Sequence, residues 1–559
     1  MTTERLPAVV EVDLTTSRRG RPSVLLEKIG AWTILEWTIS GVLECARVAS
    51  PVVLCRSGEA ARVVAALGSL PVRVVVDDTP DIPTRARLRR GRLWGKAGCR
   101  GGIGDAYFVC EAGNPHTLLR LAQSEDWPAL LIVPAEAAFI DPVLVDELAH
   151  HYLTERRGAP AYLSTAPPGF AADILHRSLL ETLVERNTSL DGAYPFLLDR
   201  PELDPDLHRV FHHYPERIIG ARARLTADTQ AQLEMMRTLW LALGGRQSRP
   251  TVAEVLAGLE ARPDLVAGCA PEEFIVETCA DGLGARAPRR AFTTTAESEL
   301  ERTGVATDCL TPANWRRVLA GLERRDDALV VFGGGYADPL LDSALETRVA
   351  AARAAGAIGI AIESCGSLLT PARAESLLAS RPDVVCVELG AVTSSDLAAM
   401  QPGRPPWELR RAGLEALLNA RKTQRDAPFV LVAVRFSRRV ASTLESFMDD
   451  WWGVVDRVIV RSHDDSRGAL CADAAGNFAP PVRSACHRVV SQLRIEWDGR
   501  VPLCQRDPEH AFAVSRLDAQ PVAELWQGAR FALARAAHAR RDFAELPHCG
   551  PCNGWYRFD

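Results

Sequence analysis

Short apolar runs and longer helical segments alternate along the first part of the chain. The apolar runs are rich in Val, Ile and Leu and have the length of buried strands, at 7–14, 51–56, 72–78, 129–134 and 159–165. Between them, apolar residues recur at the three-to-four spacing of a helix, at 24–48, 58–70 and 142–157. Strands that alternate with helices predict a mostly parallel sheet covered by helices, in a Rossmann-like α/β domain over 1–245.

A second series of apolar runs follows a proline-broken segment at 246–270, which we interpret as a linker with a helical bridge. The runs lie at 272–279, 328–335, 357–366, 382–390, 429–437 and 455–462. Helical segments separate them, so the spacing predicts about six parallel strands in an open or partial barrel over 271–480. The remaining residues, 481–559, are rich in Cys, His, Trp and Arg and poor in long strands, which indicates a small cysteine-rich domain.

Composition limits the class of protein. At 559 residues the chain is too long for one hydrophobic core. Its net charge of −6, with charges mixed along the chain, gives no reason to expect nucleic acid. The acidic start is not a signal peptide, and the longest apolar stretch cannot span a bilayer. We therefore expect a cytoplasmic protein without membrane contact, whose 14 cysteines do not form a disulfide framework.

Four cysteines near the C-terminal end have the spacing of a metal site. The pattern is C-x17-C-x44-C-x2-C, formed by Cys486, Cys504, Cys549 and Cys552. Residues 493–504 alternate as a hairpin with Asp498 and Gly499 in its turn, and a helix at 521–543 then returns the chain to the C-x-x-C pair. Four thiolates suit a 4Fe–4S cluster or a structural zinc ion. The alternative is a chance group of buried thiols.

This end of the chain resembles the SPASM domain, the cysteine-rich C-terminal extension of many radical S-adenosylmethionine (radical SAM) enzymes. The matching stretches are "LRIEWDGRVPLCQRD", "VAELW", an Arg- and His-rich helix and "PHCGPC". In that family the cysteines hold an auxiliary 4Fe–4S cluster, and the quartet here is similar to the reduced form with a single cluster. The histidines nearby are either spare ligands or neighbours of the ligands, at His487, His510, His538 and His548.

A SPASM end implies that the preceding domain is a partial (β/α)6 barrel of the radical SAM type. The stretch "LVVFGGGYADP" resembles the strand and GGEP element that cradles the methionine part of S-adenosylmethionine in this family. The resemblance gives this role to Gly333, Gly334, Gly335 and Asp338. The glycines permit close backbone approach, and Asp338 stands where the family has a glutamate. These residues either bind another small molecule or form a loop that is kept for folding.

The cluster motif of radical SAM enzymes, C-x3-C-x2-C, is incomplete after the first barrel strand. Cys279 occupies its first position, but Leu283 and Arg286 occupy the second and third. Leucine has no lone pair and arginine stays protonated, so neither side chain can bind iron. Cys269 and Cys309 are too far away in sequence to replace them simply. We therefore expect no cleavage of S-adenosylmethionine, and an active radical enzyme would need unusual ligands.

The first domain resembles the sugar cytidylyltransferases and the wider group of GT-A-like nucleotidyltransferases. Those proteins bind a triphosphate in a loop after the first strand, where this chain offers Arg18, Arg19 and Lys28. They place metal-binding aspartates after a central strand and late in the domain, where this chain has Glu136 and Asp228. The resemblance implies that these two acids hold one Mg²⁺ ion against a nucleotide phosphate. Otherwise both are ordinary capping or loop acids.

A cytidylyltransferase-like front, a radical SAM-like barrel and a SPASM end together resemble the spiro-SPASM proteins. The first hypothesis is an iron–sulfur protein of the radical SAM lineage, acting in a modification or biosynthetic pathway on a small-molecule or peptide substrate, or with a protein partner. The second is a Mg²⁺-dependent nucleotidyltransferase that uses CTP or another nucleotide and whose C-terminal domains are structural. The third is an active radical SAM enzyme with an unusual ligand set.

Overall fold

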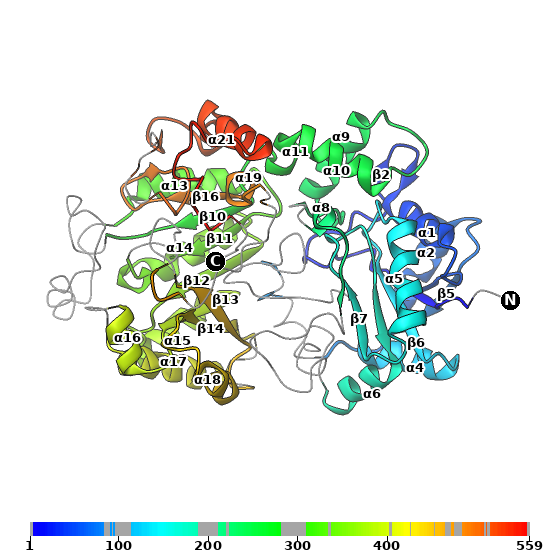
Figure 1. The fold of residues 1–559 in the computed structure, drawn as a ribbon, viewed down its shortest axis with the longest axis horizontal. Coiled ribbons are helices and arrows are strands. Elements are labelled where there is room, and N and C mark those ends of the chain that lie inside the picture. The colour runs from blue at the N-terminus through cyan, green and yellow to red at the C-terminus, as the bar shows by residue number, and fades with distance from the viewer. Residues whose placement is uncertain are drawn as a thin grey trace. The chain divides into compact units, whose positions relative to one another are not determined.

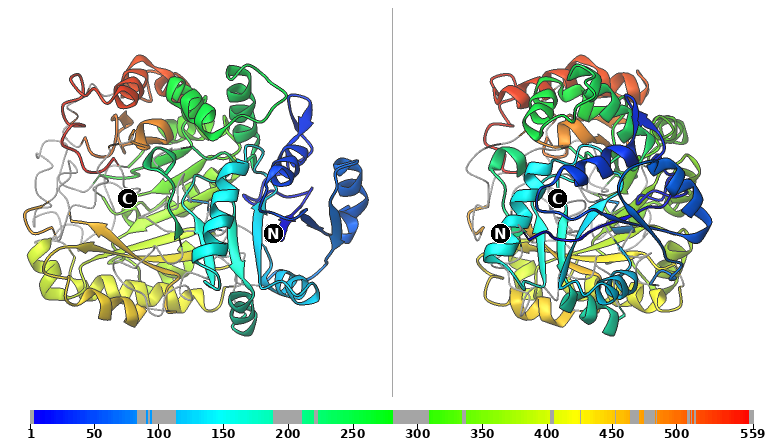
Figure 2. Two further views of the ribbon diagram at one scale, coloured as in Figure 1. Left: turned by 45° about the vertical axis from the view of Figure 1, so that its right-hand side comes forward. Right: turned by 90° about the vertical axis from the view of Figure 1, so that its right-hand side faces the viewer.

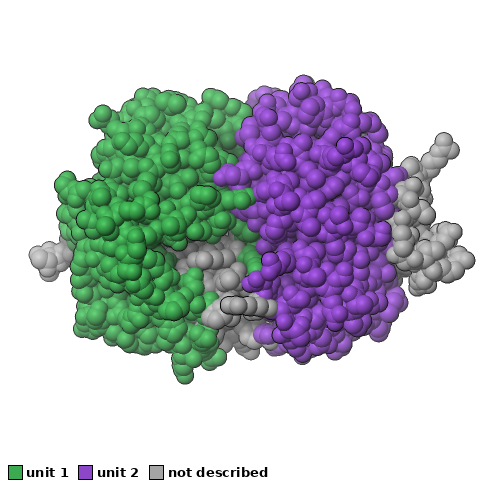
Figure 3. All heavy atoms as spheres, turned by 180° about the vertical axis from the view of Figure 1, so that it is seen from behind, with its two compact units in different colours: residues 1–101, 107–266 green, residues 102–106, 267–559 purple. Residues whose placement is uncertain are grey.

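The chain folds into two compact units, one of residues 1–101 and 107–266 (unit 1) and one of residues 102–106 and 267–559 (unit 2; Figure 3). The structure, a computed structural model, describes residues 4–82, 90–91, 93–94, 113–187, 211–219, 223–280, 309–333, 337–401, 405–424, 426–451, 453–463, 471–474, 483, 485–507, 510, 512 and 515–555. Each unit has its own seven-stranded sheet and its own helices (Figure 1).

The sheet of unit 1 has the strand order β5–β4–β1–β6–β8–β7–β9. Its strands are β1 (Ala8–Glu11), β4 (Val52–Cys55), β5 (Arg73–Val76), β6 (Ala129–Pro134), β7 (Ala161–Ser164), β8 (Asp173–His176) and β9 (Phe211–His212). β1 pairs in parallel with β4 and β6, whereas β8 runs antiparallel to β6 and β7. The chain builds β4 and β5 on one side of β1 and then crosses to β6 on the other side. Open α/β sheets bind ligands beyond the strand ends at such a reversal.

The helices of unit 1 begin where the sequence carries helix-start signals. They are α1 (Ile34–Glu44), α2 (Ala60–Leu67), α4 (Pro115–Ser124), α5 (Pro142–Glu155), α6 (Arg177–Glu185), α8 (Glu216–Ile219), α9 (Gln230–Ala242) and α10 (Val252–Ala261). Thr33 caps α1 in a reciprocal box with Glu36, and Asn114 and Asp141 cap α4 and α5 directly before a proline. These caps satisfy backbone N–H groups that the helix leaves free. A short hairpin of β2 (Lys28–Ile29) and β3 (Trp32–Thr33) precedes α1.

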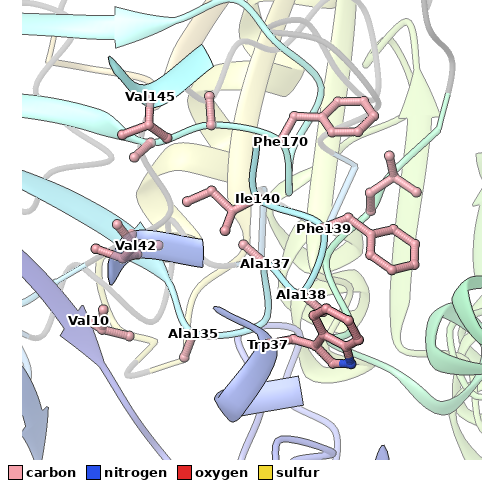
Figure 4. Close-up of a cluster of buried hydrophobic side chains, with 14 of the residues drawn as sticks. Val10, Trp37, Val42, Ala135, Ala137, Ala138, Phe139, Ile140, Val145 and Phe170 are labelled. Carbon is pink, nitrogen blue, oxygen red and sulfur yellow. The ribbon is translucent and has the colours of Figure 1, made fainter. Parts of the chain in front are cut away.

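Both faces of this sheet are buried in apolar clusters. Val10 and Val133 face a cluster that also contains Trp37, whereas the neighbouring Val9 and Ile132 face another. Figure 4 shows part of the first cluster, around Val10 and Trp37. Strands that alternate between two apolar clusters belong to a sheet covered on both faces. The prediction of a Rossmann-like α/β domain is therefore confirmed.

The sheet of unit 2 is parallel throughout and has the order β15–β14–β13–β12–β11–β10–β16. Its strands are β10 (Glu273–Val276), β11 (Leu329–Phe332), β12 (Gly359–Ser364), β13 (Val384–Gly390), β14 (Phe429–Phe436), β15 (Arg457–Ser462) and β16 (Gln492–Ile495). Strands β10 to β15 follow one another in chain order, which is the arrangement of an open (β/α) barrel, as predicted. The edge strand β16 comes from the cysteine-rich segment and pairs with β10.

Helices connect the successive strands of this sheet. They are α13 (Pro312–Leu322), α14 (Leu345–Ala354), α15 (Pro371–Ala379), α16 (Ser394–Met400), α17 (Trp407–Arg421) and α18 (Leu444–Trp451). Thr311 and Thr370 cap α13 and α15, again directly before a proline. α17 contacts β13 and α15, and the yellow helices run along one side of the strands (Figure 2).

In the part of the chain that the structure describes, no helix is both long enough and apolar enough to cross a membrane.

The two faces of the unit 2 sheet differ in chemistry. One register row crosses β10 to β14 with apolar residues only, namely Val276, Phe332, Ile362, Val385 and Val430. The opposite face carries charged and small residues near the carboxyl ends of the strands, such as Glu363 opposite Cys386 and Arg435 opposite Arg461. Paired residues of a parallel sheet lie on the same face, so these polar residues share one face. We call it the polar face.

The cysteine-rich segment adds short elements to unit 2. They are α19 (Arg488–Ser491), β17 (Arg500–Val501), β18 (Ser515–Arg516), α20 (Val522–Gln527) and α21 (Ala529–Arg540). The predicted turn is present, because the Glu496 N–H donates to the Arg500 oxygen at 2.9 Å and Gly499 has φ 84°. The strand on either side of the turn, however, pairs elsewhere: β16 pairs with β10, and β17 pairs with β18. The alternating pattern around the turn does not reveal that the free edge of β10 is the partner of β16.

Candidate functional site

The four C-terminal cysteines are presented by separate loops of unit 2. Cys486 precedes α19, Cys504 follows β17, and Cys549 and Cys552 lie in the turns after α21. All four are partly buried and none is in a disulfide. α21 returns the chain to the first two cysteines, because the Cys486 N–H donates to His538 Nδ1 on that helix at 3.3 Å. The structure therefore brings these loops into one region.

Neighbouring thiols affect the pKa values of two of the four cysteines. Burial, together with the neighbouring Cys486 and Cys552 thiols, raises the pKa of Cys504 to about 12. Burial also raises the pKa of Cys549, with contributions from Cys504, Cys486 and Cys552. The neighbouring thiols thus oppose ionisation of Cys504 and Cys549, and a bound cation would reverse that penalty. Among the described residues, no three His, Cys, Asp or Glu side chains are placed to bind a single metal ion, so the quartet is a loose group.

Backbone N–H groups point at two of the sulfur atoms. The Arg506 N–H donates to Cys504 Sγ and the Gly554 N–H donates to Cys552 Sγ, each at 3.2 Å. Such bonds favour the thiolate over the thiol, and they set the reduction potential of iron–sulfur clusters. Both donors lie two residues after the cysteine, so the turn that presents the sulfur also supplies its hydrogen bond.

Arginines hold the loops that carry the cysteines. Arg483 donates to the carbonyl oxygens of Cys549 and Gly550, at 2.6 and 2.7 Å. The buried Arg488 donates to the Gly554 oxygen. Burial raises the pKa values of Cys549 and Cys504, and positive charge from Arg483 and Arg488, respectively, opposes part of that rise. These guanidinium groups would offset the negative charge of a thiolate-bound cluster.

Three of the histidines considered as spare ligands have other contacts. His538 is 3% exposed and accepts the Cys486 N–H. His510 lies 3.0 Å from Glu496, and His548 packs edge-on against the Phe512 ring. These contacts fit the reading of histidines as neighbours of the ligands.

The polar face of the unit 2 sheet carries a charged network that the sequence reasoning missed. Arg461 on β15 bonds to Glu363 on β12 at 2.7 Å and to Glu388 on β13 at 2.8 Å. Arg435 on β14 lies 3.7 Å from Glu388. These four side chains keep between 11 and 28% of their surface exposed. Alternation of polar and apolar residues along the strands could have revealed this network. Each of its four residues lies near the end of a strand and next to a residue that faces the apolar side.

The residues matched to the S-adenosylmethionine pocket have structural partners. Gly333 has φ 120°, and an added Cβ would lie 2.5 Å from the Glu363 oxygen, so the backbones are in close contact. Asp338 accepts the Leu340 N–H through one oxygen, and the Ser364 hydroxyl and Cys365 N–H through the other, at 2.8 to 3.0 Å. Asp338 thus ties its loop to the end of β12. Gly334 and Gly335 lie outside the described residues.

Cys279, the remaining thiol of the cluster motif, is fully buried after β10. Its Sγ donates to the Asp338 oxygen at 3.5 Å, and burial raises its pKa. Cys309 lies directly opposite Cys279 in an isolated antiparallel bridge, although we considered it too far away in sequence. Leu283 and Arg286 lie outside the described residues. Sequence separation was therefore a poor guide to which thiols meet.

In unit 1, the structure brings together the predicted phosphate loop and one predicted acid. Arg18 bonds to Glu136 at 2.9 Å, beyond the carboxyl ends of β1 and β6 where the strand order reverses. The Ala227 N–H donates to the Glu136 oxygen at 2.9 Å, so the chain next to Asp228 reaches the same place. Asp228 is fully buried and pairs with Arg224, 2.8 Å from its Nε. Both acids therefore have an arginine partner.

The other predicted phosphate ligands, Arg19 and Lys28, have hydrogen-bond partners outside this pair. The loop closes on itself through a bridge between Thr16 and Pro22. Arg19 is buried and donates to the Leu93 oxygen at 3.0 Å. Lys28 lies on β2, is exposed, and its carbonyl oxygen accepts from Arg237.

Residues 486–553 match the family model of SPASM, an iron–sulfur cluster-binding domain. The predicted SPASM domain, with its iron–sulfur character, is thereby confirmed. An uncharacterized protein of Treponema pallidum (strain Nichols) is 29% identical over 116 residues, which are 21% of this chain and 31% of that protein. The match thus spans about a third of the relative's length.

Solved structures similar to this chain include a cytidylyltransferase from Leptospira borgpetersenii, with 14% identity and a TM-score of 0.34, covering 47% of this chain and 97% of that one. Another is Streptococcus suis SuiB bound to the precursor peptide SuiA, with 10% identity and a TM-score of 0.35, covering 52% of this chain and 74% of that one.

Proposed function

We infer that the chain binds one 4Fe–4S cluster through Cys486, Cys504, Cys549 and Cys552 and does not cleave S-adenosylmethionine. The observation that carries this inference is the effect of neighbouring thiols on two of the cysteines: beside burial, Cys486 and Cys552 raise the pKa of both Cys504 and Cys549. Thiolate sulfur is the ligand that clusters of this kind require. A bound cluster supplies the capacity to accept or donate an electron.

The surroundings of the quartet fit such a group. Two N–H donors already point at Cys504 and Cys552, and Arg483 and Arg488 supply positive charge at the loops. A structural zinc ion is the competing occupant, because it takes the same four thiolates. Cluster and zinc differ in iron, in acid-labile sulfide and in colour, so chemical analysis separates them.

The second part of the inference concerns the barrel. A radical SAM cluster needs three thiolates, and the chain has leucine and arginine where two of them belong. Both carboxylate oxygens of Asp338 already accept hydrogen bonds from its own loop and from the end of β12. The polar face still presents Arg461 and Glu388 at the strand ends. This supports a role in which unit 2 holds a small-molecule or peptide substrate, or a protein partner, in a modification or biosynthetic pathway.

The test is metal and sulfide analysis of the full chain purified without oxygen, together with electron paramagnetic resonance after reduction. We expect about four iron and four sulfide per chain. Cys504→Ala and Cys549→Ala should each lose most of the iron, whereas Cys269→Ala, which changes an exposed cysteine, should keep it. Stoichiometric zinc without sulfide would refute the cluster, and formation of 5′-deoxyadenosine would refute the second part of the inference.

A second candidate function, nucleotidyl transfer, is supported by Arg18 and Glu136 meeting at the reversal of strand order. Asp228 adds a buried carboxylate whose Oδ1 has no hydrogen-bond partner within the described residues. Carboxylate oxygens are the ligands that Mg²⁺ prefers, and arginine suits phosphate. Each acid now balances its charge with an arginine, so a metal ion would have to compete with Arg18 and Arg224.

Release of pyrophosphate from CTP and other nucleotides, with sugar phosphates and Mg²⁺, tests this candidate. Turnover that falls at least tenfold in Glu136→Ala and Asp228→Ala, but not in Asp126→Ala on the exposed surface, would support it. An absence of turnover with every nucleotide tested would refute nucleotidyl transfer and leave the iron–sulfur function.

A further inference from the structure

Cys279 and Cys309 occupy a special position in unit 2. They oppose each other in an antiparallel bridge, and the neighbouring bond runs from the Leu310 N–H to the Thr278 oxygen at 2.8 Å. That bond joins the residue before Cys279 to the residue after Cys309. The cysteines are therefore a non-hydrogen-bonded pair, for which the Cα atoms lie about 4.5 Å apart and the side chains are closest. Disulfides span Cα separations of about 4.4 to 6.8 Å, so the spacing typical of such a pair lies at the short end of the range that a disulfide bridges.

The backbone on both sides of the pair is held in place. The Glu277 N–H donates to the Ile495 oxygen at 2.9 Å, which fixes the chain leading to Cys279. The Leu310 oxygen accepts from Arg348 at 2.7 Å, which fixes the chain leaving Cys309. Arg348 is in turn anchored by Asp342 at 2.7 Å. Hydrogen bonds thus hold both the chain that leads to Cys279 and the chain that leaves Cys309.

The surroundings decide the order of reaction. Cys279 is fully buried in a small apolar cluster with Ala337 and Leu341, whereas Cys309 lies at its rim and is partly exposed. Burial first, and Cys309 second, raise the pKa of Cys279, so that thiol is a poor initial nucleophile. Cys309 is accessible to a reagent, and Cys279 then needs only to reach across the bridge.

We propose that Cys279 and Cys309 form a redox-active dithiol that closes to an intramolecular disulfide in reaction with a low-molecular-weight disulfide. The Cys309 thiolate attacks one sulfur of that oxidant, forms a mixed disulfide and releases one thiol. Cys279 then gives up its proton and attacks the Cys309 sulfur, which releases the second thiol. The protein loses two electrons and two protons, and the oxidant becomes two thiols. The closed disulfide would pin the two ends of residues 280–308.

The experiment uses the full chain without oxygen, equilibrated in buffers of reduced and oxidised glutathione, quenched with acid, alkylated and digested for mass spectrometry. We expect a peptide pair joined through Cys279 and Cys309, lighter by two hydrogen atoms, that vanishes on reduction. The exposed Cys269 is the internal control and should carry only glutathione or the alkyl group. In Cys279→Ala, Cys309 should accumulate the mixed disulfide; in Cys309→Ala, Cys279 should remain a thiol.

Two results would overturn the proposal. One is alkylation of Cys279 and Cys309 as separate thiols in every buffer. The other is a joined peptide that links either cysteine to a different residue in the native chain. Because two single variants are compared, misfolding of one leaves the other informative, and far-ultraviolet circular dichroism identifies it. The result is independent of iron content, so it neither rests on nor tests the proposed cluster.

Discussion

The guanidinium group of Arg483 holds the backbone of a cysteine, because its Nη2 donates to the Cys549 oxygen at 2.6 Å and its Nη1 to the Gly550 oxygen at 2.7 Å. The same guanidinium lies 4.3 Å from the centre of the Phe543 ring. One side chain therefore ties the C-x-x-C turn to the aromatic packing behind it.

Replacement of Arg483 by lysine should loosen the quartet without removing a ligand. Lysine keeps the charge but cannot make the forked pair of bonds, so we expect a loss of about 2 kcal/mol in stability. Iron should be present after reconstitution and should pass to a chelator severalfold faster. Arg541→Lys changes an exposed residue after α21 and serves as the control. An unchanged rate of iron loss in Arg483→Lys would contradict this role.

Trp526 should be the side chain on which the cysteine-rich segment depends most. It is fully buried, donates to the Ala267 oxygen at 3.0 Å, and lies 4.1 Å beneath the Arg535 guanidinium. Trp526→Ala should lower the free energy of unfolding by about 3 to 5 kcal/mol, and Trp526→Phe by about 1 to 2 kcal/mol because the ring is kept. Chemical unfolding followed by circular dichroism measures both. Equal losses in the two variants would show that packing contributes little.

Asp338→Asn should destabilise unit 2 without altering ligand binding. Asparagine keeps only one acceptor oxygen, and its amide nitrogen cannot accept the hydrogen bonds that the other carboxylate oxygen now receives, so we expect a loss of about 1 to 3 kcal/mol. Calorimetry gives binding of S-adenosylmethionine and thermal unfolding in the same samples. If the variant kept full stability and lost binding of S-adenosylmethionine, Asp338 would be a ligand group and not a structural one.

Arg461→Met should destabilise unit 2, because two carboxylates on the polar face would lose their partner. We expect a loss of about 2 to 4 kcal/mol, and a much smaller one when Glu363→Gln and Glu388→Gln are combined with it. A double-mutant cycle measures the difference. Additive losses would mean that the charges are not coupled.

Stability should depend on pH through His212 in unit 1. Burial lowers the pKa of His212, against the effect of Glu147, which raises it. As pH falls through about 6.5, the unfolded chain takes up a proton that the folded chain resists, so the free energy of unfolding should decrease. Thermal unfolding from about pH 8 to about pH 5 should show this decrease in the wild type and less of it in His212→Gln. His150→Gln, an exposed change on α5, should retain the wild-type slope.

The sequence predicts local features better than it predicts meetings between distant residues. The start of α5 was readable because a proline follows Asp141 at the first helical position. The start of α1 was not, because helical periodicity begins at residue 24 whereas the structure has the β2–β3 hairpin before Ile34. The SPASM domain was readable because the cysteine spacing and the neighbouring residues match that domain, whereas the role of the four cysteines as ligands stays a prediction. The pairing of β16 with β10 and the bridge from Cys279 to Cys309 were not readable. Such contacts depend on which strand edge is open in the folded chain, and no local pattern records that.

The same limit explains the acids of unit 1. Glu136 and Asp228 were predicted from a resemblance to nucleotidyltransferases, which have acids after a central strand and late in the domain. Their arginine partners, Arg18 and Arg224, stand 118 and 4 residues away along the chain. The sequence offers 65 lysine and arginine residues as candidate partners, so only the folded structure identifies these two.

β16 forms the hydrogen bonds at the edge of β10, so the cysteine-rich end is part of the barrel sheet. It cannot be exchanged between proteins as an independent domain. A chain shortened before Gln492 would expose the unpaired N–H and C=O groups of β10 to other molecules, and open strand edges invite aggregation. Movement of the loops that carry the cysteines would therefore disturb β10, the first barrel strand. The shared sheet implies that the barrel and the cysteine-rich end are inherited together.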